Sequence, residues 1–155
     1  MSSMNPFTTY GRTTRTLYMA SIIALFGLWI LMRANLTVFT AGEAFARVVL
    51  SLIILWPAYC VTVMRLHDSD RTSLLAIALL VTSILGVAIE ATSDTLSYQQ
   101  GIAYLLTAII SLTNLVCVVV ISFFPPTRGA NRYGADPRGK AGKAERAAEL
   151  DSYNS

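Results

Sequence analysis

The residues best placed to do chemistry lie in one short segment, Arg65-Leu66-His67-Asp68-Ser69-Asp70-Arg71, which is the densest ionisable cluster of the chain. An imidazole beside a carboxylate, as in His67 and Asp68, can act as an acid–base pair. No nucleophile, metal-ligand constellation or phosphate-binding loop accompanies this pair, and His67 is the only histidine. We therefore expect no metal, no cofactor and no enzymatic activity. A hydrogen bond from His67 to Asp68 or to a backbone carbonyl is favoured over a ligand or proton-transfer role.

A second polar segment, residues 123–137, has the sequence FFPPTRGANRYGADP. Its two adjacent prolines end the apolar run that precedes it, because proline cannot continue a helix. Glycine and asparagine suit tight turns, so the segment is predicted to fold back close to the surface from which it emerges. It adds Arg128, Asn131 and Arg132 to the residues that could contact a ligand.

The helices that carry these two segments can be located from the stretches of sequence that lack charged residues. Only 14% of the residues are charged, against about 25% in soluble domains. Four windows without Asp, Glu, Lys or Arg hold 85 of the 155 residues, and the other 70 residues hold all 21 charges. A helix needs about 20 apolar residues to cross the hydrocarbon of a bilayer. The pattern predicts an all-α integral membrane four-helix bundle, with spans at about 16–34, 46–65, 73–91 and 101–124.

Basic residues predict the orientation of the spans, because they are enriched on the cytoplasmic side. With four spans both termini lie on one side, which holds ten of the twelve basic residues, whereas the other side holds only Arg33 and Arg47. We therefore predict that both termini are cytoplasmic. The chain then divides into a cytoplasmic N-terminal segment at 1–15, a four-span transmembrane domain at 16–138 and a disordered basic and polar cytoplasmic tail at 139–155.

Small and polar side chains within the spans are expected to hold the helices together, since lipid removes most of the hydrophobic drive for helix association. An unpaired amide is costly in hydrocarbon. Asn114 is therefore predicted to face another helix, with a structural hydrogen bond favoured over a polar site. The predicted helix-packing residues of the third and fourth spans are Ala78, Thr82, Gly86, Ala103, Thr107, Ser111 and Asn114.

Both polar segments resemble motifs of a family of small bacterial inner-membrane proteins, the domain of unknown function 805 family, also described as YhaH-like. The resemblance covers roughly residues 7–138 and rests on an aromatic, Arg-rich start, on Val63-Met64-Arg65-Leu66-His67-Asp68, and on the Gly-Ala-Asn-Arg-Tyr-Gly-Ala-Asp-Pro run at 129–137. Family members usually have a second arginine where this chain has Met64, and a Gly, Ser and Trp run at 69–74. The resemblance implies a multi-pass protein of the bacterial cytoplasmic (inner) membrane, and it brings no activity with it.

The favoured function is that of a non-enzymatic bundle that binds lipids or other membrane proteins, or that assembles as a homo-oligomer. Each arginine near the anionic inner leaflet contributes ~1 kcal/mol of attraction, so the polar segments would form a basic collar there. The candidate lipid- or ligand-binding residues are Arg65, His67, Asp68, Arg71, Arg128, Asn131 and Arg132. An equally strong interpretation is that the arginines only set the topology.

Other functions are less well supported by the sequence. A small oligomeric channel or transporter subunit is the alternative, with Thr107, Ser111 and Asn114 lining a pore. Proton-coupled carriers usually need an ionisable group within a span, and the four windows hold no acidic or basic residue. A membrane enzyme that uses His67 and Asp68 is the third hypothesis. The net charge of +3 is explained by the topology determinants, so no nucleic-acid partner is expected.

Overall fold

The computed structural model describes residues 7, 9–35, 43–93, 100–134 and 136–138. In chain order its helices are α1 (Arg15–Asn35), α2 (Glu43–Asp68), α3 (Leu74–Ser93) and α4 (Gln100–Phe123). The described residues contain no strand beyond an isolated bridge between Asn131 and Gly134. The predicted all-α four-helix architecture is confirmed, and every helix end lies within three residues of the predicted span. The predicted tail at 139–155 lies outside the described residues.

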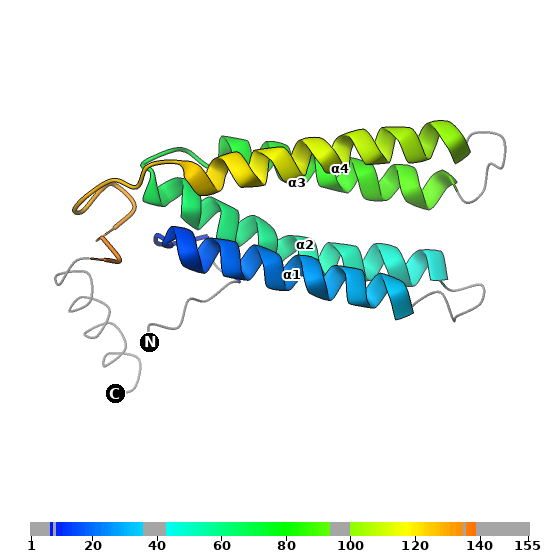
Figure 1. Ribbon diagram of the computed structural model, residues 1–155, viewed down its shortest axis with the longest axis horizontal. Helices are drawn as coiled ribbons and strands as arrows, with labels where there is room; N and C mark the ends of the chain where they lie inside the picture. Colours follow the sequence, from blue (N-terminus) through cyan, green and yellow to red (C-terminus); the bar gives the residue numbers. More distant parts are fainter. Residues whose placement is uncertain (1–6, 8, 36–42, 94–99, 135, 139–155) are drawn as a thin grey trace.

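The helices run alternately in opposite directions, side by side along the long axis of the molecule (Figure 1). The start of α1, the end of α2, the start of α3 and the end of α4 therefore lie at one end of the bundle. The two polar segments also lie here, and we call it the polar end. Among the described residues, three helices contain stretches long and apolar enough to cross a membrane, and the apolar stretch of α3 is shorter.

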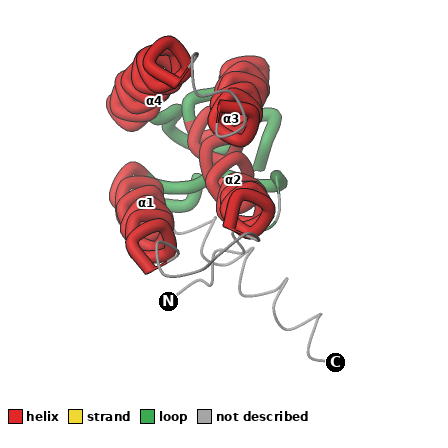
Figure 2. Tube along the Cα trace, turned by 90° about the vertical axis from the view of Figure 1, so that its right-hand side faces the viewer, coloured by secondary structure: helices red, strands yellow, loops and turns green. Residues whose placement is uncertain are grey.

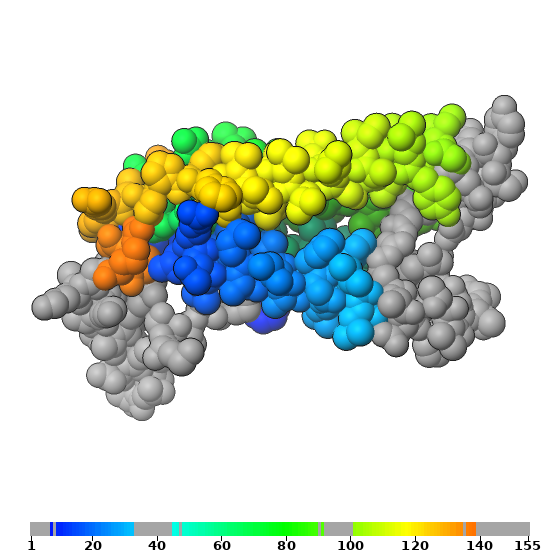
Figure 3. Space-filling view, in the orientation of Figure 1, coloured from blue at the N-terminus to red at the C-terminus, as the bar shows by residue number. Residues whose placement is uncertain are grey.

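The helices differ strongly in how much of their surface they bury in the protein. α2 packs against α1, α3 and α4, whereas α1 and α3 do not contact each other (Figure 2). Of the candidate membrane span of α2, 44% is buried inside the protein, against 6% for α1 and 11% for α4. Large apolar side chains such as Phe26 and Leu31 on α1 and Leu105 on α4 are exposed. These two helices make up most of the face seen in Figure 3. A surface of this kind requires an apolar surrounding, as a bilayer provides.

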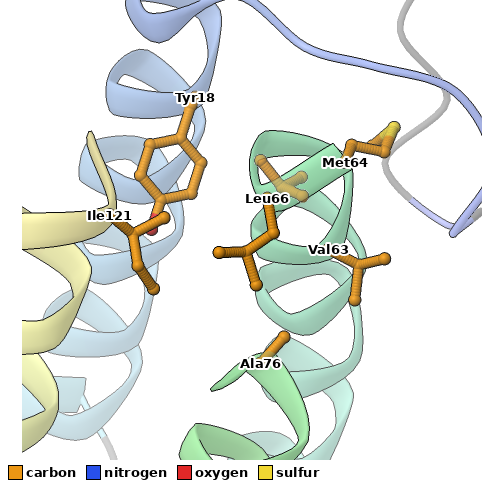
Figure 4. Packing of buried hydrophobic residues seen from close by; sticks show 7 residues of the cluster. Tyr18, Val63, Met64, Leu66, Ala76 and Ile121 are labelled. Carbon is orange, nitrogen blue, oxygen red and sulfur yellow. The ribbon is translucent and has the colours of Figure 1, made fainter. Parts of the chain in front are cut away.

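The buried apolar cluster is concentrated towards the polar end. It draws side chains from all four helices (Figure 4), namely Tyr18, Val61, Val63, Met64, Leu66, Ala76 and Ile121. The ends of the four helices therefore pack around a common apolar core, and this core fixes the positions at which the two polar segments begin.

The end of α2 is closed by a local backbone motif. The N–H of Arg71 donates to the carbonyl oxygen of Leu66, and the N–H of Asp70 donates to that of His67, both within 3.1 Å. This pair of bonds is a Schellman motif, which satisfies carbonyls that the helix leaves free. Asp70 has a φ of +53° and thus occupies the left-handed position that glycine usually takes.

Candidate functional site

Asp68 is the centre of the polar end, and three arginines from separate parts of the chain surround its carboxylate. Arg12 donates from Nε and Nη2 to Oδ1, at 3.2 and 3.0 Å. Arg65 donates from Nη1 to Oδ2 at 2.7 Å, and Arg138 reaches Oδ1 from Nη2 at 3.4 Å. Asp68 is 0% exposed, and Arg12 and Arg65 are 3% and 1% exposed. This arrangement is a buried ion cluster rather than a surface ion pair.

Arg65 also closes the end of α4. Its Nη2 donates to the carbonyl oxygens of Ser122 and Phe124, at 3.0 and 2.6 Å. The last carbonyls of a helix have no partner within it and carry partial negative charge, so a guanidinium suits this place. Arg65 was predicted among the lipid- or ligand-binding residues, but its guanidinium is buried and contacts Asp68 and backbone carbonyl oxygens inside the protein.

Arg12 joins the N-terminal segment to the loop that follows α4. Its Nη1 donates to the carbonyl oxygen of Gly129 and its Nη2 to that of Thr127, both at 2.6 Å. Thr127 in turn donates from its N–H and from Oγ1 to the carbonyl oxygen of Asp68, both at 2.8 Å. One side chain thus ties together three segments that are distant in sequence.

His67 and Tyr133 hold the second polar segment against the end of α2. Their rings stack with centroids 3.7 Å apart and planes inclined by only 6°. Asn131 donates from Nδ2 to the carbonyl oxygen of His67 at 2.9 Å, and its backbone exchanges two 3.0 Å hydrogen bonds with Gly134. The predicted fold-back of this segment is observed, and Asn131 Nδ2 also donates to Oγ1 of Thr127 at 2.9 Å.

The remaining arginines of the polar end face outwards. The guanidinium of Arg15 lies over the ring of Phe123, and that of Arg71 lies over the ring of Phe124, each 4.1 Å from the ring centroid. Such cation–π contacts leave the charge at the surface. Arg132 pairs with Asp70 at 3.2 Å, but both side chains are about half exposed, at 54% and 44%. Arg128 is exposed as well.

Asp136 carries a charged carboxylate outside the buried cluster. The backbone N–H of Arg138, the Arg138 side chain and the N–H of Gly129 donate to its carboxylate and lower the pKa of Asp136 to about 2. Asp136 thus remains ionised and shares Arg138 with Asp68.

The predicted packing residue Asn114 lies between α3 and α4. Thr82 donates from Oγ1 to Asn114 Oδ1 at 2.8 Å, and Asn114 Nδ2 donates to Ser83 Oγ at 3.0 Å. Gly86 is buried in the same interface, where an added Cβ would lie 3.6 Å from Cγ2 of Ile110. These contacts join α3 and α4 of one chain and use both polar atoms of the Asn114 amide.

The other four predicted packing residues divide into two groups. Ala103 and Thr107 are partly buried, whereas Ala78 and Ser111 are exposed. Residues four apart advance about 40° around a helix with 3.6 residues per turn, so one end of each stripe turns away from the neighbouring helix.

The described residues contain no group of three or more His, Cys, Asp or Glu that could hold a metal ion. A comparison with family models matches residues 6–135 to a protein of unknown function, DUF805. The chain belongs to the DUF805 family. The matched part of this DUF805 chain includes Arg12, Arg65 and Asp68 but ends before Arg138. No curated protein and no solved structure shows significant similarity to the chain.

Arg12 belongs to the buried cluster of this DUF805 chain, but the sequence indicated it only as one of the basic residues that set the membrane topology. Its partners lie 56 residues and more away, so no local pattern reveals the pairing. The signal that could have found it is the Arg-rich start of the resemblance, since a buried carboxylate such as Asp68 needs positively charged partners. Thr127 and Tyr133 were missed for the same reason.

Proposed function

We propose that this DUF805 protein is a non-enzymatic, four-span protein of the bacterial inner membrane whose polar end binds anionic lipid head groups. In this proposal both termini lie in the cytoplasm, because ten of the twelve basic residues lie on their side of the predicted spans and basic residues are enriched on the cytoplasmic side. The apolar outer faces of α1 and α4 support the membrane location.

The observation that carries the proposal is a division of the arginines at the polar end. Arg12 and Arg65 point inwards, where they form ion pairs with Asp68 and donate hydrogen bonds to backbone carbonyl oxygens. Another set stays exposed around the same end, where an anionic leaflet would meet the bundle. This exposed set, which we call the collar, consists of Arg15, Arg71, Arg128 and Arg132.

The collar keeps Arg71, Arg128 and Arg132 of the candidate set expected from sequence and adds Arg15, which was not in that set. Arg65 and Asp68 are buried and cannot reach a head group, and the side-chain amide of Asn131 already donates within the protein. Four exposed guanidinium groups near an anionic surface supply ~1 kcal/mol each, which is enough to enrich anionic lipid around the polar end.

Native mass spectrometry of the full chain released from nanodiscs tests this proposal. Mixed phosphatidylglycerol and phosphatidylethanolamine nanodiscs are expected to yield protein enriched in bound phosphatidylglycerol. The Arg71→Ala/Arg128→Ala variant should lose this enrichment, and the matched Arg33→Ala/Arg47→Ala variant, which changes the opposite face, should keep it. Equal enrichment in both variants, or co-purification of a protein or of a second copy without lipid preference, contradicts the proposal.

A further inference from the structure

Two arginines of the collar lie on aromatic rings at the end of α4. The guanidinium of Arg15, at the start of α1, lies over the ring of Phe123. The guanidinium of Arg71, between α2 and α3, lies over the ring of Phe124. In both pairs Cζ of the arginine is 4.1 Å from the ring centroid. Two consecutive residues therefore hold cations that come from different parts of the chain.

Both pairs lie where the apolar stretches of the helices end. The candidate membrane span of α1 begins at Arg15, and that of α4 ends at Phe123. Arg71 precedes the apolar stretch of α3, which begins at Leu74. In a bilayer the hydrocarbon gives way to the head groups at this level. Both guanidinium groups would therefore lie beside the phosphates of the lipids.

A ring below a guanidinium leaves the hydrogen-bonding edge of that guanidinium free. The contact with the ring uses the flat face, whereas the five N–H bonds point outwards in the plane of the group. Among the described residues, the side chains of Arg15 and Arg71 have no hydrogen bond and no ion pair. An oriented planar group can donate to two oxygens of one phosphate and loses little side-chain freedom when it binds.

The buried cluster supports the backbone that carries the two rings. Arg65 donates from Nη2 to the carbonyl oxygens of Ser122 and Phe124, at 3.0 and 2.6 Å. The side chain of Phe124 also packs against the buried apolar cluster, whereas Phe123 is 62% exposed. The rings therefore have a fixed support, and each ring limits the positions that the arginine above it can take.

The other two arginines of the collar each lack one of these features. Arg132 lies over the ring of Tyr133 at 4.8 Å, but it also pairs with Asp70 at 3.2 Å, and this carboxylate competes with a phosphate. Arg128 is exposed and has no ring contact among the described residues. These two arginines attract an anionic leaflet without presenting an oriented and unpaired guanidinium.

Given the lipid-binding polar end of the proposed function, on which this inference rests, we propose that Arg15 and Arg71 each bind the phosphate oxygens of one anionic lipid. Phe123 and Phe124 are the positioning residues of these two sites, and Arg128 and Arg132 contribute charge alone. Phosphatidylglycerol fits such a site better than phosphatidylethanolamine does, because the ammonium of the latter lies near its own phosphate and repels the guanidinium.

Variants that preserve charge test the two sites, with lipid binding resolved by native mass spectrometry from the same mixed nanodiscs. Wild type should bind two phosphatidylglycerol molecules more tightly than any others. Phe123→Leu keeps all four collar arginines and should weaken one of the two about two- to tenfold, because Arg15 is no longer held. Phe123→Trp should keep both, since it retains an aromatic face. Phe26→Leu is the matched control, because Phe26 is 55% exposed and stacks on Trp29, and it should bind as wild type does.

A pair of lysine variants separates charge from shape. Arg15→Lys should weaken the same site, because lysine keeps the charge but has no planar group of donors, whereas Arg128→Lys should bind as wild type does. Inorganic phosphate should displace neither lipid when compared with chloride at equal ionic strength, and displacement would assign the sites to soluble phosphate and overturn the proposal.

Three further outcomes overturn the two sites. They are wild-type binding in Phe123→Leu, equal loss in Phe123→Leu and Phe123→Trp, and equal effects of the two lysine variants. Each of these leaves the collar intact if Arg71→Ala/Arg128→Ala still removes the enrichment in phosphatidylglycerol. An absence of that enrichment in wild type overturns the proposed function together with the two sites.

Discussion

Two polar clusters tie the helices of this protein together, one buried around Asp68 and one partly buried around Asn114, and they differ in charge and in the sequence separation that they bridge. Around Asp68, charged side chains connect residues up to 122 positions apart. Around Asn114, neutral groups connect residues 31 and 32 positions apart. The first cluster joins the N-terminal segment, α2 and the loop after α4, whereas the second joins only α3 and α4.

The difference shows how each cluster should respond when one member is removed. Breaking a buried ion pair leaves a charge without compensation and costs about 3–5 kcal/mol. Interhelical hydrogen bonds between neutral side chains in membrane proteins average about 0.6 kcal/mol. The polar end is therefore expected to dominate the stability of the assembled bundle, and the α3–α4 pair to adjust its packing at small cost.

Asp68→Ala is expected to cause the largest loss of stability, about 3–5 kcal/mol. The substitution leaves Arg12 and Arg65 buried without their shared carboxylate. Unfolding by titration with sodium dodecyl sulfate in mixed micelles measures the effect. In an Arg12→Ala background the same substitution should cost clearly less, because one of the two stranded charges is gone. Strictly additive losses would show that the cluster is not a unit and would break the contrast with Asn114.

Arg12→Lys is expected to cost about 1.5–3 kcal/mol, because lysine keeps the charge but cannot bridge the same acceptors. Arg12 uses three nitrogens to reach Asp68, Thr127 and Gly129, and lysine has a single nitrogen. The control is Arg15→Lys, which alters an exposed cation–π contact with Phe123 and should change stability by less than about 1 kcal/mol. Equal losses in the two variants, read from the same detergent titration, would mean that charge alone matters.

The sequence predicted the helices well because the signal for them is local. Runs without charge, and prolines after Phe124, depend only on neighbouring residues. The candidate site was predicted in part, since His67, Asp68 and Asn131 do meet at the polar end. The burial of Arg65 and the role of Arg12 depend on where α1 and α4 end in space. Such tertiary pairings replace the default tendency of arginine to extend towards water.

Asn114→Leu is expected to destabilise the bundle by about 0.6 kcal/mol and by no more than about 1.7 kcal/mol. Leucine has a similar shape, and the substitution releases the hydroxyls of Thr82 and Ser83, which can bond to backbone carbonyls. Thr82 already contacts the carbonyl oxygen of Ala78 at 3.0 Å. Thr113→Val is the control, because Thr113 is exposed and donates to Ile109 of its own helix. A loss as large as that of Asp68→Ala would remove the distinction between the clusters.

Asp70→Gly sharpens the comparison by changing the backbone beside Asp68 without touching its carboxylate. Asp70 has a φ of +53° at the end of α2, a conformation that costs a residue with a Cβ about 1–2 kcal/mol and costs glycine little. Glycine also removes the exposed ion pair with Arg132, which is worth about 0.2–1 kcal/mol. We therefore expect a net gain between zero and about 1.8 kcal/mol in wild type, and a larger gain in an Arg132→Ala background, where no ion pair is lost. A loss of stability in that background would show that the Asp70 side chain, and not its backbone conformation, closes α2, and that the strength of the polar end extends beyond the buried cluster at Asp68.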